Sequence, residues 1–124
     1  MMVDDLRYLG EDKKNQGKVV EAETLFKRAL ALYEKLPKEN GFNIALTLRD
    51  MGLLCRDTSR FEEAEIFYKR ALAIFEKLPE RDHSTIAMTA LTLRDIAVLC
   101  RNTHRLEEAD DFEQQAIRLL SSDQ

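Results

Sequence analysis

Basic side chains that return at fixed positions are the residues best suited to bind a ligand. The pair Arg49 and Arg56 recurs 45 residues later as Arg94 and Arg101. Each pair belongs to a set of four residues spaced by three, four and three, a spacing that places the set on one stripe of an α-helix. The three sets are Asp4, Arg7, Glu11 and Lys14; Leu46, Arg49, Leu53 and Arg56; and Leu91, Arg94, Val98 and Arg101. Arginine can bind carboxylates bidentately, and aliphatic side chains can receive an apolar anchor.

Two interpretations of these stripes are open. Stacked side by side, they form two rows of cations with apolar side chains between them, which suits a peptide with acidic and apolar residues. Alternatively, the arginines only pair with carboxylates on neighbouring helices, and surface pairs of that kind contribute little to stability. The carboxylates best placed for such pairing are Asp50 and Asp95.

Motifs for catalysis or metal binding are absent from the sequence. It has no glycine-rich phosphate loop, no HExxH motif and no nucleophile beside an obvious base, so we expect no enzyme activity and no cofactor. Cys55 and Cys100 fall at the same position of a repeat. Packed helix axes lie about 8–10 Å apart, beyond the ~7 Å that a disulfide spans between Cα atoms, so we expect buried free thiols. Cys100 and His104 alone are too few ligands for a metal site.

Composition narrows the class of protein. The 124 residues are 34% charged and 44% apolar, which suits one domain of amphipathic helices. A formal charge of −4 argues against nucleic acid as the partner. No apolar run approaches the roughly 20 residues of a membrane span, and the N-terminus does not resemble a secretory signal. We therefore expect a cytoplasmic protein that binds neither nucleic acid nor membrane.

The chain consists of three copies of one segment. KRALALYEKLP at 27–37 returns as KRALAIFEKLP at 69–79, and CRDTSRFEEA at 55–64 returns as CRNTHRLEEA at 100–109. Such periods indicate an all-α solenoid, whose units bury their apolar faces by stacking. We predict one domain over 1–124, with repeats at 3–37, 43–79 and 86–121. The expected helices are 3–15, 18–36, 43–57, 60–78, 84–102 and 105–121. Ser59 and Glu62 fit a capping box at the start of the fourth helix.

The middle repeat resembles a known family. Leu48-x-x-Met51-Gly52-x-x-Cys55, followed by Ala64-x-x-x-Tyr68, Ala71 and Pro79, resembles the tetratricopeptide repeat (TPR) signature, and the 42-residue spacing is similar to the kinesin-light-chain type. The resemblance implies a right-handed superhelix of three repeats, with a concave groove that binds a peptide segment of a partner protein. It assigns to that groove Arg7, Lys14, Leu46, Arg49, Leu53, Arg56, Leu91, Arg94, Val98 and Arg101. The alternative is a structural or self-associating scaffold module without a ligand groove.

The two ends differ from the middle. The first helix is polar where Leu53 and Leu54 stand in the middle repeat, and Ile66 and Tyr68 are replaced by Asp111 and Glu113 in the third. In that last helix Phe112, Ala116 and Ile117 are expected to keep the inner face apolar. Because solenoids need polar terminal faces, we expect a complete three-repeat domain that is monomeric.

Overall fold

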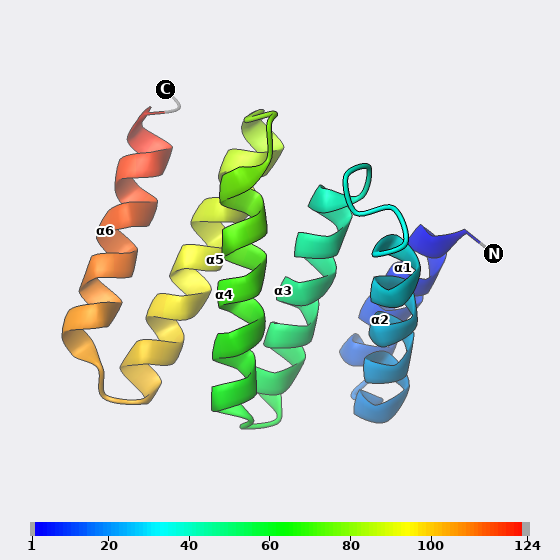
Figure 1. Cartoon of the computed structure of the whole chain (residues 1–124). Helices are drawn as coiled ribbons and strands as arrows, with labels where there is room; N and C mark the ends of the chain where they lie inside the picture. Colours follow the sequence, from blue (N-terminus) through cyan, green and yellow to red (C-terminus); the bar gives the residue numbers. More distant parts are fainter. Residues whose placement is uncertain (1, 123–124) are drawn as a thin grey trace.

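The computed structural model describes residues 2–122 as six α-helices joined by short turns (Figure 1). The helices are α1 (Val3–Asn15), α2 (Val19–Tyr33), α3 (Gly41–Asp57), α4 (Phe61–Lys77), α5 (His83–Asn102) and α6 (Leu106–Ser122). Each begins and ends within three residues of its expected bounds. Within 2–122 none of these helices is long and apolar enough to cross a membrane.

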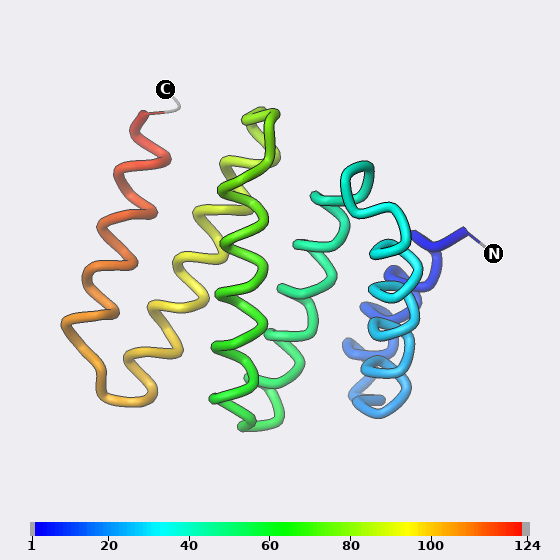
Figure 2. Tube along the Cα trace, viewed as in Figure 1, coloured from blue at the N-terminus to red at the C-terminus, as the bar shows by residue number. Residues whose placement is uncertain are grey.

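The helices form three hairpins that stack in sequence order. The most extensive contacts join α1 to α2, α3 to α4, and α5 to α6, and smaller ones join α2 to α3 and α4 to α5. Figure 2 shows the hairpins side by side, with the first at one end of the row and the third at the other. Over the described residues the first and third hairpins do not contact each other. This confirms the predicted all-α solenoid.

A glycine lets the two helices of a hairpin approach closely. A Cβ on Gly10 would lie 2.6 Å from the Phe26 ring, and a Cβ on Gly52 would lie 2.5 Å from the Tyr68 ring. Both aromatic rings are fully buried. The ring of α2 or α4 therefore packs directly on the backbone of the preceding helix, in the space that any larger residue would fill.

The turns inside the hairpins share one backbone conformation. Gly17, Ser59 and His104 stand at equivalent positions and have φ of 77°, 62° and 63°. This left-handed conformation closes the end of the first helix and leads directly into the second. The capping box predicted for Ser59 is therefore wrong: α4 begins after Arg60, which makes no side-chain cap. The sequence pattern was misleading because Ser59, with its positive φ, terminates α3 and does not cap the start of α4.

Substitutions at two of these turn positions should change the free energy of unfolding in opposite directions. Gly17→Ala should lower the free energy of unfolding by about 1 kcal/mol, because alanine is strained at positive φ. No atom lies within 4 Å of the added Cβ, so the effect comes from the backbone alone. Ser59→Gly should raise stability by less than that, since relief of strain is partly offset by a more flexible unfolded chain. Urea unfolding midpoints measure both; a loss of stability in Ser59→Gly would contradict this explanation.

Two isoleucines of the second helices, Ile66 and Ile117, are more exposed than the sequence suggests. Ile66 is 59% exposed, so it does not lie on a stacking face, whereas Tyr68 is buried. Ile117, expected on the inner face of the last helix, is 48% exposed. Ile66 lies beside the stripe of alanines through which α4 packs. Ile117 stands at the position of Leu72, which is 9% exposed because it packs in the core shared with the third hairpin. Ala64, Ala71, Ala109 and Ala116 are all fully buried.

Candidate functional site

The three stripes of the candidate site lie on the first helices of the hairpins. α1 contacts α3, and α3 contacts α5, so the stripes are neighbours in space. The structure therefore brings the ten candidate residues onto adjacent helices, although their side chains differ widely in exposure.

In the first row of cations (Arg7, Arg49 and Arg94), two of the three arginines form ion pairs between helices. Arg7 is buried, with Nη1 2.9 Å from Glu11 Oε1 and 3.6 Å from Asp50 Oδ2. Arg49 Nε donates to Asp95 Oδ2 at 2.7 Å. The pairing considered from the sequence thus occurs for these two arginines, each bridging to the next repeat.

The last cation of that row is different. Arg94 is exposed and has no carboxylate oxygen within 4 Å among residues 2–122. It occupies in the third repeat the position that Arg7 and Arg49 occupy in the first two. Arg7 and Arg49 each pair with an aspartate of the following repeat, and residues 2–122 contain no repeat after the third. Arg94 therefore has no equivalent aspartate among them.

The two carboxylates of the row have different surroundings. Burial raises the pKa of the Asp50 carboxyl to about 7, helped by the charge of Glu11, while Arg7 acts in the opposite direction. Burial also raises the pKa of Asp95, but Arg49 opposes it through a direct hydrogen bond. Asp50 Oδ2 accepts no hydrogen bond from the described residues, so the distant Arg7 compensates poorly for lost hydration.

The second row of cations is more accessible. Lys14 is half-buried on α1. Arg56 Nη2 lies 3.0 Å from Asp57, its neighbour in sequence, and Arg101 Nη1 lies 2.5 Å from Glu113. Their side chains are 33% and 38% exposed. Exposed pairs of this kind contribute little to stability, so a ligand carboxylate can replace the internal one.

Leu53 and Val98 lie between the two rows of cations, as the spacing predicts, whereas Leu46 and Leu91 lie beyond the first row. Leu46 and Leu53 of α3 are half-buried, and Leu91 and Val98 of α5 are 41% and 43% exposed. We call these four side chains on two neighbouring helices the aliphatic strip; Arg49 and Arg94 stand between its two ends. This strip, with Arg56 and Arg101 beside it, is the part of the candidate site that a ligand can reach.

A second set of links between repeats was missed from the sequence. Arg60 Nη1 lies 3.2 Å from Glu23 Oε1, and Arg105 Nη1 donates to Glu65 Oε2 at 3.1 Å. The bond from Arg105 holds the pKa of Glu65 below its usual range. Glu23 and Glu65 also lie near the lysine four residues later, Glu23 at 3.7 Å from Lys27 Nζ and Glu65 at 2.8 Å from Lys69 Nζ. The sequence does carry a signal for these links. Glu23 and Glu65 stand at equivalent positions of successive repeats, and so do Arg60 and Arg105.

The two cysteines and the metal-ligating residue types of the described part of the chain form no reactive or metal-binding cluster. Cys55 and Cys100 are free and buried, and burial raises the pKa of both thiols. Within residues 2–122 no three His, Cys, Asp or Glu side chains are grouped to hold a metal.

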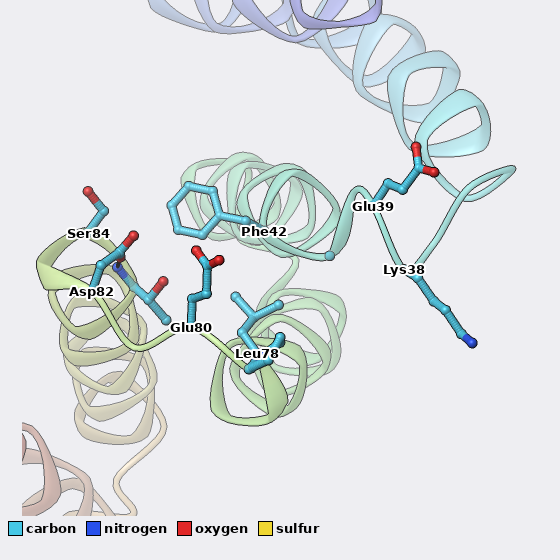
Figure 3. A pocket seen from close by; sticks show the side chains of 10 residues that line it. Lys38, Glu39, Phe42, Leu78, Glu80, Asp82 and Ser84 are labelled. Carbon is cyan, nitrogen blue, oxygen red and sulfur yellow. Dashed lines mark hydrogen bonds between the residues drawn. The ribbon is translucent and has the colours of Figure 1, made fainter.

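An open cavity of about 450 Å³ lies at the linkers between repeats, away from the stripes. Figure 3 shows Phe42, Leu78 and Glu80 around it. Its Asp82 carboxylate already accepts the Thr85 backbone N–H at 2.8 Å and caps α5. The Phe42 ring packs edge-on against Phe75, with ring centroids 5.7 Å apart.

Comparison with known proteins supports the repeat assignment. A family model described as tetratricopeptide repeat matches residues 5–77. The fold is similar to the crystal structure of BtubC (BKLC) from P. vanneervenii, with a TM-score of 0.88 and 20% sequence identity. That match covers 97% of this chain and 47% of BtubC, so the chain spans about half the length of that protein. No curated protein sequence matches the chain.

The family match covers more than half of the chain, including the middle repeat whose residues carried the predicted signature. The stacked hairpins extend the same architecture to the third repeat. Repeats of this family generally mediate protein–protein interaction and are typically non-catalytic. The chain belongs to the tetratricopeptide repeat family.

Proposed function

We propose that the chain binds a peptide segment of a partner protein along the surface formed by α1, α3 and α5. The observation that carries this proposal is the aliphatic strip of Leu46, Leu53, Leu91 and Val98. Its two α5 members are more than 40% exposed although they belong to a helix that is otherwise well packed. Apolar side chains at equivalent positions of neighbouring helices offer exposed apolar contacts for a ligand.

The cations beside the strip favour an acidic ligand. Arg56 and Arg101 stand at equivalent positions, and each is paired only with exposed carboxylates of its own repeat. A glutamate or aspartate of the ligand can take the place of Asp57 or Glu113 and form a bidentate pair. The ligand that fits is a segment with apolar residues in register with the strip and acidic residues at its edge.

The proposal includes a monomer that acts in the cytoplasm and does not bind nucleic acid. The formal charge of −4 disfavours nucleic acid as the partner. Binding of a protein segment requires no cofactor, and we propose none.

The test is selection of ligands from a displayed peptide library, followed by affinity measurement for each selected peptide. The double variant Arg56→Gln and Arg101→Gln should weaken the selected acidic peptides about tenfold or more, with less dependence on salt. Leu91→Ser should weaken them through loss of apolar contact. Arg49 is a poor choice for this test, because its removal also leaves Asp95 without its hydrogen bond.

The matched control is Ile66→Ser, which changes an exposed aliphatic residue on α4, outside the stripes. It should leave the affinity unchanged. Selected peptides that lose affinity in Ile66→Ser but keep it in the arginine and Leu91 variants would place binding elsewhere and refute the proposed surface.

A further inference from the structure

A groove crosses the edge of the solenoid where the two linkers between repeats meet. It consists of the open cavity of about 450 Å³ and an adjoining cavity of about 410 Å³. Both cavities are lined by Lys38, Gly41, Leu78 and Pro79, so they are two parts of one depression, which we call the linker groove. None of the candidate residues on α1, α3 and α5 lines it. The linker groove is therefore separate from the surface proposed above.

The apolar part of the linker groove is formed by the fold itself. Phe42 and Leu78 are half-buried and pack against the core shared by the first and middle hairpins. Phe75 holds the Phe42 ring edge-on, with ring centroids 5.7 Å apart. A Cβ on Gly41 would lie 2.8 Å from Leu78 Cδ2, so glycine at this position lets Leu78 lie directly on the start of α3. A ligand therefore meets an apolar surface that is already in place.

Carboxylates stand at one end of the linker groove. Glu80 and Asp82 line only the cavity of about 450 Å³, and Figure 3 shows both on the side of Phe42, away from Lys38. Glu80 is exposed, and no cation lies within 4 Å of it among residues 2–122. Asp82 is also exposed, and the hydrogen bond that it accepts from the Thr85 N–H leaves its negative charge in place. This end of the groove therefore favours a cation.

Ammonium groups stand at the other end. Lys38 and Lys77 line the cavity of about 410 Å³, which neither Glu80 nor Asp82 lines. Both lysines are exposed, and neither has a carboxylate oxygen within 4 Å among the described residues. Glu39 follows Lys38, but it lines only the larger cavity, and Figure 3 shows these two side chains pointing in different directions. This end of the groove therefore favours an anion.

The linker backbone beside the groove is suited to an extended ligand. Leu78 and Asp82, at the two ends of the linker, have ψ of 136° and 176° and so are extended. Among the described residues, the backbone N–H groups of Glu80 and Arg81 donate no hydrogen bond. An extended segment that lies beside such a backbone gains main-chain hydrogen bonds.

The combination of groups identifies the chemistry of the ligand. Nucleic acid and anionic lipid offer negative charge alone, which Glu80 and Asp82 would repel. A protein segment can carry a cation, an apolar group and an anion together. In an extended segment, residues i, i+2 and i+4 share one face and span about 13 Å. Three such groups at alternate positions therefore face the groove together.

We propose that the linker groove binds an extended segment of a partner protein in which a basic, an apolar and an acidic residue stand at alternate positions. The basic residue pairs with Glu80 and Asp82. The apolar residue contacts Phe42 and Leu78, and the acidic residue pairs with Lys77. The surface on α1, α3 and α5 takes no part, so either proposal can fail without the other.

The experiment compares three capped pentapeptides that differ only in charge. They are Lys-Ser-Leu-Ser-Glu, Lys-Ser-Leu-Ser-Lys and Glu-Ser-Leu-Ser-Glu, and the amide NMR signals of the full chain follow each titration. The mixed-charge peptide should shift the signals of Gly41, Phe42 and Ser84. It should bind about threefold more tightly than either of the other two, with a smaller difference at high salt. Replacing its leucine by serine should weaken it, because the apolar contact is lost.

Two variants of the protein show whether the groove itself selects the peptide. Glu80→Lys reverses one charge at the acidic end and removes no ion pair within the described chain. It should abolish the preference for the mixed-charge peptide over the peptide with two glutamates. The matched control is Glu76→Lys, which makes the same change in net charge at an exposed position of α4 that does not line the groove. The control should leave the order of the three peptides unchanged.

The proposal fails if the peptides do not distinguish the two ends of the groove. Equal affinity for the three peptides, shifts at Leu91 and Val98 in place of the groove, or an unchanged order in Glu80→Lys would each overturn it. So would tightest binding of a like-charged peptide by the wild type, which would identify a purely anionic or purely cationic ligand. A dimer mass by light scattering, lost in Glu80→Lys, would identify a second copy as the occupant, with the same consequence.

Discussion

Replacing Gly52 by alanine is expected to lower the free energy of unfolding by about 2–3 kcal/mol. The added methyl group would lie 2.5 Å from two atoms of the Tyr68 ring. Tyr68 is fully buried, so the clash is relieved only if α3 and α4 move apart, and overpacking of this kind costs about 1–3 kcal/mol. Alanine is otherwise the better helix former, so a purely local effect would have the opposite sign.

The third repeat supplies the control. Ala97 is equivalent to Gly52, and Glu113 is equivalent to Tyr68, so a methyl group is accommodated where no ring opposes it. Ala97→Gly should therefore cost only the roughly 1 kcal/mol difference in helix propensity. Urea unfolding of Gly52→Ala, Tyr68→Leu and the double variant measures the coupling. If the two single changes add without interaction, the ring is not the cause.

Neutralising Asp50 is expected to change how stability depends on pH. Its pKa is raised by burial to about 7 in the folded chain, against about 3.8 unfolded. Between these values the folded state binds more protons, so this group's contribution is fully present below about pH 4 and is lost as pH rises through about 7. At about 1.4 kcal/mol per pKa unit, the loss is on the order of 4 kcal/mol at most. Asp50→Asn should remove it, and so be more stable than the wild type at pH 8.

The difference between variant and wild type is the quantity to measure, by urea unfolding from pH 4 to pH 8. Other carboxylates act in the opposite direction, since the lowered pKa of Glu65 stabilises the fold above pH 4.5 and is lost on acidification. The matched variant is Asp95→Asn, which loses the charged hydrogen bond from Arg49 and should be less stable than the wild type at pH 8. If both variants destabilise equally at pH 8, Asp50 is well compensated and the explanation fails.

The sequence predicts the architecture well because the information is local and repeated three times. The alternation of helices follows from apolar periodicity, and the small residues of the TPR signature, such as Gly52, fix which faces meet. The turn at Ser59 was misread because the same residue types favour a helix start and a left-handed helix end. Only the backbone conformation separates the two.

From the sequence, the candidate residues could be assigned to stripes on three helices. The sequence did not show which of their side chains form ion pairs within the chain. A period of 42 or 45 residues puts Arg49 and Arg94 on equivalent positions, yet one is paired with Asp95 and the other has no ion pair within the described chain. Equivalent residues differ here because the partner lies in the next repeat, and a pattern in one helix does not specify what stands opposite. The links from Arg60 and Arg105 were missed for the same reason.

Contacts confined to adjacent hairpins also determine how the chain folds and how its ends communicate. Nearly all contacts join residues within one hairpin or between neighbours, and such local topology permits rapid folding that can begin in any repeat. A ligand held near α1 can affect α5 only through α3 and α4. The middle hairpin therefore couples the two ends energetically. If it opens, the first and third hairpins become independent, and the proposed ligand surface is divided.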